Sequence, residues 1–328
     1  KSIQTDLRIM FYNVENYFDT YDDTLTDDHE FMPSSLRNWN YKRFLHKRNN
    51  IYKTIMAVGG WQPPAIIGLC EIENRFVLNQ LVYETPFKSY DYRIIHEESP
   101  DLRGIDVALL FNPELIKVVN HEAISIHFPW DSTLKTRDIL YVKMHVIGTG
   151  ILHVYINHWP SRYGGELSSE PKRVFVAKQL ADRIDALLKE EPNAAIVVLG
   201  DLNDSPSNKS VKEVLVERED PHRSRLIQLM DETDNAKGTH KFNGDWGILD
   251  QILVSEVLMD TTSNMVIKGK GKVFYADFLL QKDKKYMGEK PFRTYLGVRY
   301  LGGFSDHLPI FVDMQINKAK DRDVTISN

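Results

Sequence analysis

Short apolar runs recur along the chain, and most of them end at a glycine, a proline or a polar residue. Runs of this length that are rich in β-branched residues predict β-strands. The run at 196–199, which Gly200 closes, is the clearest case and predicts a strand buried within a sheet. By the same pattern we predict further strands at 7–12, 65–70, 106–111, 139–146, 151–157, within 246–254, and at 308–312.

Other segments carry apolar residues at helical spacing. In 41–58 an apolar stripe includes Phe44, Tyr52 and Ile55, and a glycine pair at 59–60 is expected to end the helix. In 170–189 the apolar face runs through Ala177 and Ile184. We predict a shorter helix at 208–216 and a charged loop at 220–225.

The predicted strands outnumber the helices and fall into two groups on either side of about residue 160. Such apolar strands need cover on both faces, which two packed sheets with helices outside would give. We therefore predict an α/β fold with a single domain over residues 1–317, followed by a polar, frayed tail at 318–328.

Composition excludes several classes of protein. The chain has 328 residues, and 42% of them are hydrophobic, which is enough for one large core. Cys70 is the single cysteine, so an intramolecular disulfide is excluded, and we read this thiol as a core residue. No apolar stretch approaches the ~18 residues of a membrane span. The sequence begins at Lys1 rather than Met, so the compartment stays open, with export to the periplasm or beyond as an option. We expect a monomer.

Charge is distributed unevenly along the chain. The formal net charge is −5, which argues mildly against non-specific coating of nucleic acid. Residues 268–299, however, are rich in lysine and arginine and contain several aromatic residues. This basic aromatic segment is either a solvated hairpin with an aromatic underside or a surface for phosphates and stacked bases.

An acidic segment at 19–30 follows the first predicted strand. It contains Asp19, Asp22, Asp23, Asp27, Asp28 and Glu30. It lacks the glycine and the ligand spacing of an EF-hand loop. We therefore interpret it as a solvated acidic loop.

Polar residues cluster where the predicted strands end. Asp201 and Asn203 follow Gly200, and because side chains alternate along a strand, both should leave its end on one side. Alone, this pair is also ordinary turn chemistry. Comparable positions at or beside other strand ends are held by Asn13, Glu71, His158, Asp306 and His307. If these ends meet at one edge, the pocket suits Mg²⁺ or Mn²⁺ and phosphate chemistry.

Asp250 lies inside an otherwise apolar run. A carboxylate there is costly unless it is paired or hydrogen-bonded. With the distant pair Asp306-His307, this predicts a hydrogen bond between an aspartate and a histidine, which would fix the tautomer of the imidazole.

These motifs resemble those of the endonuclease/exonuclease/phosphatase superfamily, which includes pancreatic deoxyribonuclease. The resemblance covers nearly the whole chain and is carried by Tyr12-Asn13-Val14-Glu15-Asn16, Leu69-Cys70-Glu71-Ile72-Glu73-Asn74, Asn157-His158, Gly200-Asp201-Leu202-Asn203, Leu249-Asp250-Gln251-Ile252 and Ser305-Asp306-His307-Leu308-Pro309. It implies a four-layer α/β/β/α sandwich of two mainly antiparallel sheets, with the site at the rim between them.

The resemblance also implies roles for single residues. Glu71 would be the principal metal ligand, with Asn13 and Asp306 completing the metal sphere. The metal would be Mg²⁺ or Mn²⁺, with Ca²⁺ as a further option. Asp201 would orient and deprotonate the attacking water, helped by Asn203. The remaining catalytic residues would be His307, hydrogen-bonded to Asp250 and acting as a base or on the phosphate, and His158, donating to a phosphoryl oxygen.

Several residues carry two interpretations. Arg137 is similar to an arginine that family nucleases use on the phosphate, while Arg103 either contacts a phosphate at the rim or forms a salt bridge with Asp106. Trp159 and Arg162 either line the cleft or are packing residues. We read as structural His127, His145 and His153, and as supports of the site Glu15 and Glu73.

The superfamily cleaves many phosphoesters, and the fold does not separate them. Asn-Val-Glu-Asn at 13–16 resembles a bacterial subgroup described as endonucleases, which favours a nuclease or phosphodiesterase acting on nucleic acid or another phosphodiester. The alternatives are a phosphatase for small molecules or lipid headgroups, such as inositol phosphates or sphingomyelin, and a catalytically silent binding module.

Overall fold

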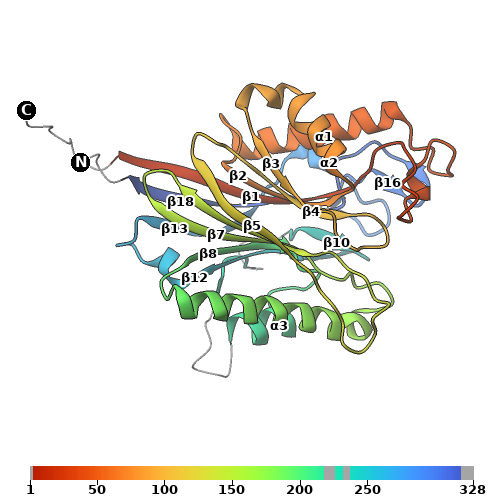
Figure 1. The fold of residues 1–328 in the computed structure, drawn as a ribbon. Helices are drawn as coiled ribbons and strands as arrows, with labels where there is room; N and C mark the ends of the chain where they lie inside the picture. Colours follow the sequence, from red (N-terminus) through yellow and green to blue (C-terminus); the bar gives the residue numbers. More distant parts are fainter. Residues whose placement is uncertain (1–2, 218–225, 232–236, 319–328) are drawn as a thin grey trace, which may run out of the picture.

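The computed structural model describes residues 3–217, 226–231 and 237–318 of the chain. Two six-stranded sheets form its centre (Figure 1). The first has the order β13 (Met265–Val273), β18 (Ile310–Lys318), β1 (Ile3–Tyr17), β2 (Ile66–Ile72), β4 (Asp106–Phe111) and β3 (Arg93–His96). The second has the order β5 (Ile116–Ile124), β6 (Ile139–Val146), β7 (Gly150–His158), β8 (Ala195–Asp201), β12 (Asp250–Ser255) and β9 (Leu226–Gln228).

Both sheets share one pattern of strand directions. The central pair of each, β1–β2 and β7–β8, is parallel, and the pairs beside it are antiparallel. Parallel neighbours need a crossover connection. Helix α1 (Tyr41–Gly59) lies on the crossover from β1 to β2, and α3 (Glu166–Glu190) on that from β7 to β8.

The helices form the two outer layers. Helices α1 and α2 (Arg75–Tyr83) cover the first sheet and α3 covers the second, which confirms the predicted four-layer sandwich (Figure 1). Shorter elements are η1 (His29–Phe31), η2 (Pro86–Tyr90), α4 (Lys209–Val211), the π-helical turn η3 (Lys212–Val216), η4 (Glu256–Met259), η5 (Asp277–Leu279) and the hairpins β10 (His240–Phe242) with β11 (Asp245–Gly247), β14 (Leu280–Lys282) with β15 (Glu289–Pro291), and β16 (Tyr295–Leu296) with β17 (Arg299–Tyr300).

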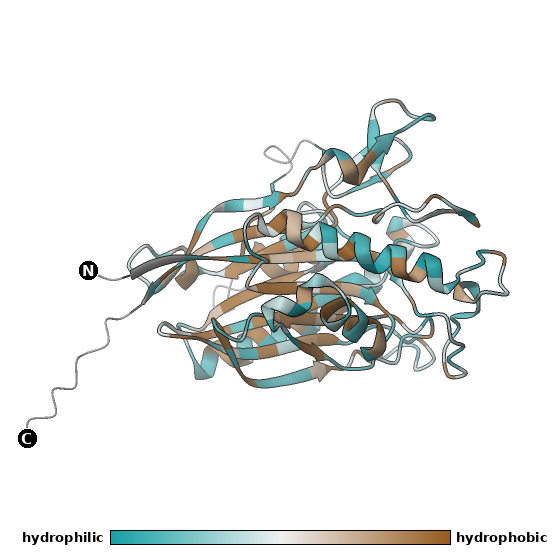
Figure 2. Cartoon of the chain, turned by 90° about the horizontal axis from the view of Figure 1, so that it is seen from above, coloured by the Kyte–Doolittle hydropathy of each residue, from teal (hydrophilic) through white to brown (hydrophobic). Residues whose placement is uncertain are grey.

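Alternating side chains fill the spaces between the layers. On β1, Ile9 and Phe11 pack between the two sheets, whereas Met10 and Tyr12 pack under the helices. On β8, Val197 and Leu199 point into the same central core, while Val198 faces α3. This period-two alternation places apolar strands inside and leaves the hydrophilic residues of the helices outside (Figure 2).

The structure refines several of the predicted elements. The two groups of strands on either side of residue 160 do not correspond to the two sheets, because β5–β7 belong to the second sheet and β13 and β18 return to the first. The predicted strand within 246–254 is divided into β11 and β12, and the helix at 208–216 is one α-helical turn followed by η3. The predicted loop at 220–225 and the tail beyond Lys318 lie outside the described residues.

The basic aromatic segment supports the interpretation as a hairpin with an aromatic underside. Phe274, Tyr275, Phe278 and Phe292 are partly buried against the central core. Some of its basic side chains form ion pairs with acids, as Lys268 does with Asp6 and Lys290 with Asp283. Elsewhere Cys70 is buried, as expected of a core thiol. In the described part of the chain, no helix is long and apolar enough to cross a membrane.

His153 gives the fold a dependence on pH. It is fully buried in β7, with Nδ1 2.8 Å from the Tyr141 hydroxyl and Nε2 3.3 Å from a Glu191 carboxylate oxygen, and Lys143 lies nearby. Burial lowers the pKa of His153 below its ordinary value, against the raising effect of Glu191. The unfolded chain therefore binds the proton more readily than the folded one, so stability is complete above about pH 6.5 and decreases as the pH falls.

We expect the melting temperature of His153→Gln to fall less between about pH 7.5 and 5.5 than that of the parent protein. Thermal unfolding at both pH values measures this. His145→Gln, on the neighbouring strand β6, is the control and should keep the parental loss. Equal losses in all three proteins would contradict the account.

Candidate active site

Strand register brings three of the predicted residues onto one face of the second sheet. His158 on β7 and Asp250 on β12 are the direct partners of Asp201 on β8, one on each side. Residues opposite one another in neighbouring strands point to the same face. Asp201, His158 and Asp250 are all at least nine-tenths buried. The centre of the candidate site is therefore set by the pairing of β7, β8 and β12.

Gly200 lets β7 and β8 approach closely beside this centre. A Cβ atom at this position would lie 2.5 Å from the carbonyl oxygen of Asn157. Real Cβ atoms do not come so close, so any side chain would push the strands apart. The glycine that closed the apolar run in the sequence thus sets the separation of His158 and Asp201.

Asn13 joins the two sheets across the rim. Its amide Nδ2 donates to Asp201 Oδ2 at 3.0 Å and to Glu71 Oε1 at 3.3 Å. Its Oδ1 accepts from the backbone N–H of Glu15 at 3.0 Å. The Ser305 hydroxyl donates to the Asn13 carbonyl at 2.7 Å and so fastens the loop before β18 to the same point.

Glu71 is held in an uncommon backbone conformation. Its φ is 61°, at an irregularity in the pairing of β2 with β1 and β4. Left-handed backbone at a non-glycine residue costs about 1–3 kcal/mol and is concentrated at functional sites. Glu71 Oε2 accepts from the Asn16 N–H at 2.8 Å. Helix α2 begins only four residues later, at Arg75 after the cap residue Asn74, so Glu71 belongs to the end of β2.

The predicted hydrogen bond between Asp250 and His307 is present. His307 Nδ1 lies 2.7 Å from Asp250 Oδ2, and Nε2 lies 3.7 Å from Asp201 Oδ2. Burial alone would lower the pKa of His307, but the carboxylates of Asp250 and Asp201 outweigh it and raise the pKa well above its ordinary value. His307 is therefore a cation near neutral pH, with Nε2 directed toward Asp201.

Asp201 and His158 are shifted toward their neutral forms. Burial, reinforced by the charge of Asp250, raises the pKa of Asp201 to about 7 even though His307 lowers it. Burial, followed by the charges of Arg137 and Arg103, holds the pKa of His158 well below its ordinary value. His158 Nε2 lies 3.8 Å from Asp201 Oδ2 and 3.9 Å from Glu71 Oε1. The site thus holds a neutral and a cationic imidazole around one carboxylate.

Asn203 supports Asp201 through its backbone. Its N–H donates to Asp201 Oδ1 at 2.9 Å, and its side-chain amide donates to the Trp159 carbonyl at 3.1 Å. Trp159 is buried beneath α3 and is a packing residue. Arg162 donates to the Asn203 carbonyl at 2.7 Å. The loop after β8 is therefore fixed from several sides.

Arg293 is a site residue that the sequence prediction missed. Its guanidinium lies 2.9 Å from Asp306 Oδ2 and 3.1 Å from Glu15 Oε1. Although burial opposes the shift, the charge of Arg293 lowers the pKa of Asp306. Glu15 therefore supports the site, as predicted, by holding this arginine. The sequence showed Arg293 as one of nine basic residues in 268–299, with no feature to distinguish it.

His240 was also missed. It belongs to the hairpin β10–β11, its ring centroid lies 4.8 Å from that of His307, and the two backbones form a bridge. Burial lowers the pKa of His240 to about 4, so the imidazole is neutral. No signal in the sequence marked His240, because no predicted strand ends beside it. Only the folded structure places it against His307.

The two predicted phosphate arginines are placed differently from each other. Arg137 is buried, pairs with Asp101 at 2.9 Å, and donates to the carbonyls of His158 and Trp159 at 3.1 and 2.5 Å. Arg103 is half-exposed, with Nε 3.6 Å from Asp101. The salt bridge from Arg103 to Asp106 is wrong, because Asp106 is bound by His96 and Ser99.

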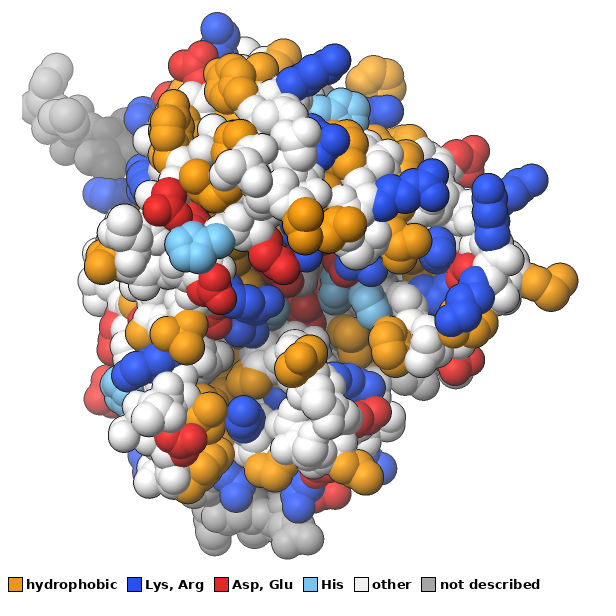
Figure 3. Space-filling view, turned by 90° about the vertical axis from the view of Figure 1, so that its right-hand side faces the viewer, with side chains coloured by type: hydrophobic (Ala, Val, Ile, Leu, Met, Phe, Trp, Pro, Cys, Tyr) orange, Lys and Arg blue, Asp and Glu red, His pale blue; other side chains and the backbone are white. Residues whose placement is uncertain are grey.

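A basic cavity lies beside the centre of the site. Its volume is about 430 Å³, and its lining includes four cationic side chains, those of Arg103, Lys135, Arg137 and Lys172. Phe128, Pro160 and Tyr163 contribute apolar and aromatic surface. In the space-filling view of this face, acidic side chains and histidines gather in a central hollow with lysines and arginines around it (Figure 3).

Acidic side chains outnumber basic ones at the rim, which favours the binding of a divalent cation. Five carboxylates meet there, and they belong to Glu15, Glu71, Asp201, Asp250 and Asp306. The cations that the fold sets against them are those of Lys47, Arg293 and His307. Burial, reinforced by the charge of Asp306, raises the pKa of Glu15 to about 7. The donors are oxygen atoms with imidazoles nearby, which suits Mg²⁺ or Mn²⁺.

Two packed sheets with an oxygen-lined pocket at their rim suit a hydrolase of phosphoesters. The chain belongs to the Endonuclease/Exonuclease/phosphatase family, whose model matches residues 8–316. Members of this family are phosphoester hydrolases that use divalent metals. The resemblance seen in the sequence is thereby confirmed. None of the curated proteins matches this chain.

Solved structures show the same fold at low sequence identity. An endonuclease/exonuclease/phosphatase of Bacteroides vulgatus is 14% identical, with a TM-score of 0.59, over 95% of this chain and 100% of its own. The human Nocturnin catalytic domain with bound sulfate is 16% identical, with a TM-score of 0.57, over 96% of both chains. A mannosyl-6-phosphatase of Bacteroides thetaiotaomicron is 14% identical, with a TM-score of 0.59, over 94% of this chain and 99% of its own.

Proposed function

We propose that this protein is a divalent-metal-dependent phosphodiesterase, with a nucleic acid or another phosphodiester as its substrate. The observation that carries the proposal is the position of Asp201, which is buried between His158, Asp250 and His307 and bridged to Glu71 by Asn13. Its raised pKa of about 7 suits a general base at neutral pH.

Glu71 would be the main ligand of the metal, with Asn13 and Asp306 contributing through water. The bound ion would supply Lewis-acid stabilisation of charge on the phosphate. Arg293 binds Asp306 and Glu15 and so sets the outer positions of this donor group. Mg²⁺ and Mn²⁺ fit the oxygen donors best, and the choice between them belongs to experiment.

The side chains of the second sheet would act on the water and the phosphate. Asp201 would orient the attacking water and accept its proton. His307, kept positive by Asp250, would donate from Nε2 to a phosphate oxygen, and His158 would donate to another. Asn203 and Arg137 are positioning residues, because Asn203 holds Asp201 and Arg137 holds the backbone of His158. Such preorganised donors stabilise the charge that develops in phosphoryl transfer.

The basic cavity favours a diester with further phosphates over a simple monoester. Three of its cations, Arg103, Lys135 and Lys172, would contact the phosphates that flank the scissile one in a polyanionic chain. The second candidate is a small-molecule phosphatase. It is favoured by the likeness in fold to the mannosyl-6-phosphatase, whose name gives a phosphomonoester as its substrate.

A substrate panel tests the proposal. The protein would be assayed with Mg²⁺, with Mn²⁺ and with EDTA on plasmid DNA, RNA oligonucleotides, inositol phosphates, sugar 6-phosphates and p-nitrophenyl phosphate. We expect metal-dependent cleavage of diester substrates to exceed phosphate release from monoesters by at least about tenfold in kcat/KM. Faster turnover of a monoester would replace the proposed activity with the second candidate, and turnover of none would contradict both.

A further inference from the structure

The acidic segment at 19–30 is solvated only in part. Asp22, Asp23, Asp27 and Glu30 are exposed, as predicted, whereas Asp19 and Asp28 are buried. The Asp19 N–H donates to Glu73, and Asp19 Oδ2 accepts from Asn74 Nδ2 at 3.0 Å. Glu73, which was predicted to support the site, thus anchors the beginning of this segment.

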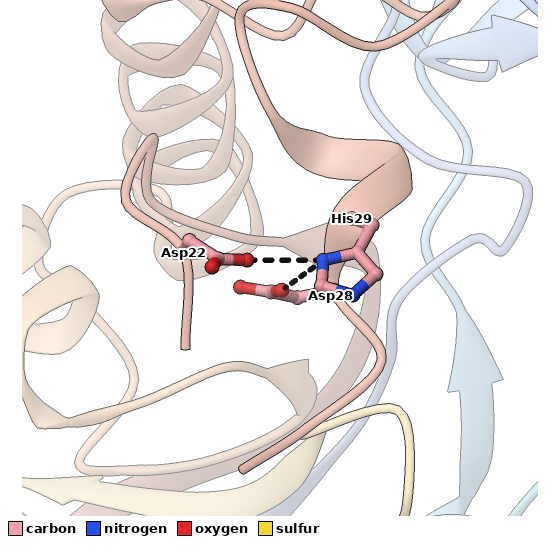
Figure 4. Close-up of side chains that lie close together, drawn as sticks. All are labelled: Asp22, Asp28 and His29. Carbon is pink, nitrogen blue, oxygen red and sulfur yellow. Dashed lines mark hydrogen bonds and ion pairs between the residues drawn. The ribbon is translucent and has the colours of Figure 1, made fainter. Parts of the chain in front are cut away.

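Three side chains of the segment converge on one point. Asp22 Oδ1 lies 3.0 Å and Asp28 Oδ1 3.8 Å from the same nitrogen, Nδ1 of His29. Figure 4 shows both carboxylates turned toward the same nitrogen of this ring. One ligand atom of each of the three residues lies within 4.8 Å of the other two. Asp22 and His29 are exposed, so the point is open to solvent on one side.

One carboxylate oxygen of Asp28 is buried at this point without a hydrogen-bond donor. The Asp28 side chain is 2% exposed, and its Oδ2 accepts from the Asp23 N–H at 3.0 Å. Its Oδ1 is buried, has no hydrogen-bond partner and faces the cluster. A buried carboxylate oxygen without a donor costs free energy, and an ion is one of the few explanations for it in a folded protein. A cluster of surface acids alone would not point to an ion, and this buried oxygen is the second, independent observation that does.

We propose that Asp22, Asp28 and His29 bind a divalent transition-metal ion, Zn²⁺ or Mn²⁺, at a site separate from the catalytic pocket. Two carboxylate oxygens and one imidazole nitrogen form the mixed donor set that such ions take, with solvent completing the coordination. The imidazole disfavours Ca²⁺ and Mg²⁺, which prefer oxygen ligands alone.

The site would have a structural role at the rim of the active site. The N–H of Asp27, next to Asp28, donates to the Leu102 carbonyl at 2.7 Å. Thr26 packs where a side chain at Gly104 would stand. The segment therefore braces the loop that carries Arg103, one of the cations of the basic cavity. An ion at Asp28 would fix both loops together.

Zinc binding tests this inference independently of the substrate. Four proteins would be compared: the parent and the variants Asp28→Asn, His29→Gln and Asp27→Asn. Each would be stripped with EDTA, dialysed, and titrated with Zn²⁺ and with Mn²⁺ by calorimetry. Asp27 is exposed and adjacent, so Asp27→Asn removes the same charge without touching the cluster. We expect Asp28→Asn and His29→Gln to bind one ion fewer, or at least about tenfold more weakly, and Asp27→Asn to bind as the parent does.

Thermal unfolding gives a second readout. Zn²⁺ or Mn²⁺ should raise the melting temperature of the parent and of Asp27→Asn, and raise it less in the two cluster variants. His29→Gln keeps the test decisive if Asp28→Asn does not fold, because His29 is exposed. Equal binding by all four proteins would overturn the inference, as would a stabilisation by Ca²⁺ that equals that by Zn²⁺.

Discussion

Asp201→Asn is expected to lower the turnover of the hydrolysed phosphoester by about 10³-fold, the range for loss of a positioned general base. The amide cannot accept the proton of water, while the shape of the side chain is kept. Because Asp201 accepts from Asn13 Nδ2 and from the Asn203 N–H, the amide can keep only one of these two bonds. We expect a modest loss of melting temperature, measured together with the rate.

Asp245→Asn is the matched control for this change. Asp245 is exposed on β11, and its substitution should leave both the rate and the melting temperature as in the parent. A rate of Asp201→Asn within about tenfold of the parent would remove Asp201 from the chemistry. A low rate with a large loss of melting temperature would show instead that the carboxylate is needed for folding.

Arg173→Met is expected to destabilise the protein by about 3–5 kcal/mol, the largest effect on stability that we expect. Arg173 is fully buried in α3, and its Nε lies 2.7 Å from Asp204 Oδ1. The Ser210 hydroxyl donates to the other oxygen of Asp204 at 2.6 Å. Without the guanidinium, the buried carboxylate loses its nearest cation and keeps only Arg162, whose Nη2 lies 3.5 Å from Oδ1. Urea unfolding measures the loss of free energy of unfolding.

Two further variants show whether the buried pair is the cause. Arg183→Met, on the exposed face of the same helix, removes only a surface ion pair with Glu122 and should cost less than about 1 kcal/mol. Adding Asp204→Asn to Arg173→Met also removes the buried carboxylate that has lost its nearest cation, and should restore part of the stability. Loss of the same size in both single variants would contradict a special role for the buried pair.

Most residues of the candidate site could be predicted from the sequence because they stand at the ends of predicted strands. Asp250 within an apolar run required a partner, and His307 is that partner at 2.7 Å. Gly200 followed by Asp201 marked the end of a buried strand, and the register of β7, β8 and β12 then places His158 and Asp250 on either side. In each case a local cost or a local pattern pointed to the long-range contact.

Other features had no local signal. The left-handed backbone of Glu71 arises where β2 meets β1 and β4, and only the assembled sheet imposes it. Arg137 was expected at the phosphate, but the folded chain buries it against Asp101 and two carbonyls, where it supports the backbone of His158. Arg293 depends on Asp306 and Glu15, which lie far from one another in the sequence.

The order of the strands within each sheet could not be predicted from the sequence either. Predicted strands were grouped by their position along the chain, whereas the sheets are assembled by pairing β18 with β1 and β12 with β8 across long separations. The burial of Asp19 and Asp28 within the acidic segment was not predicted, for the same reason. A run of aspartates is usually solvated, and only the contacts of Asp19 with Glu73 and Asn74 draw it inward.

The central claim is that residues from both sheets form one pocket that works with a divalent cation held by Glu71. The most direct test is the initial rate of phosphoester hydrolysis as a function of free Mg²⁺, for the EDTA-stripped parent and for Glu71→Gln. We expect no turnover without metal, saturable recovery in the parent, and in Glu71→Gln a requirement for at least about tenfold more Mg²⁺ with a lower maximal rate. Full activity of the parent in EDTA, or the same Mg²⁺ dependence in both proteins, would contradict the claim.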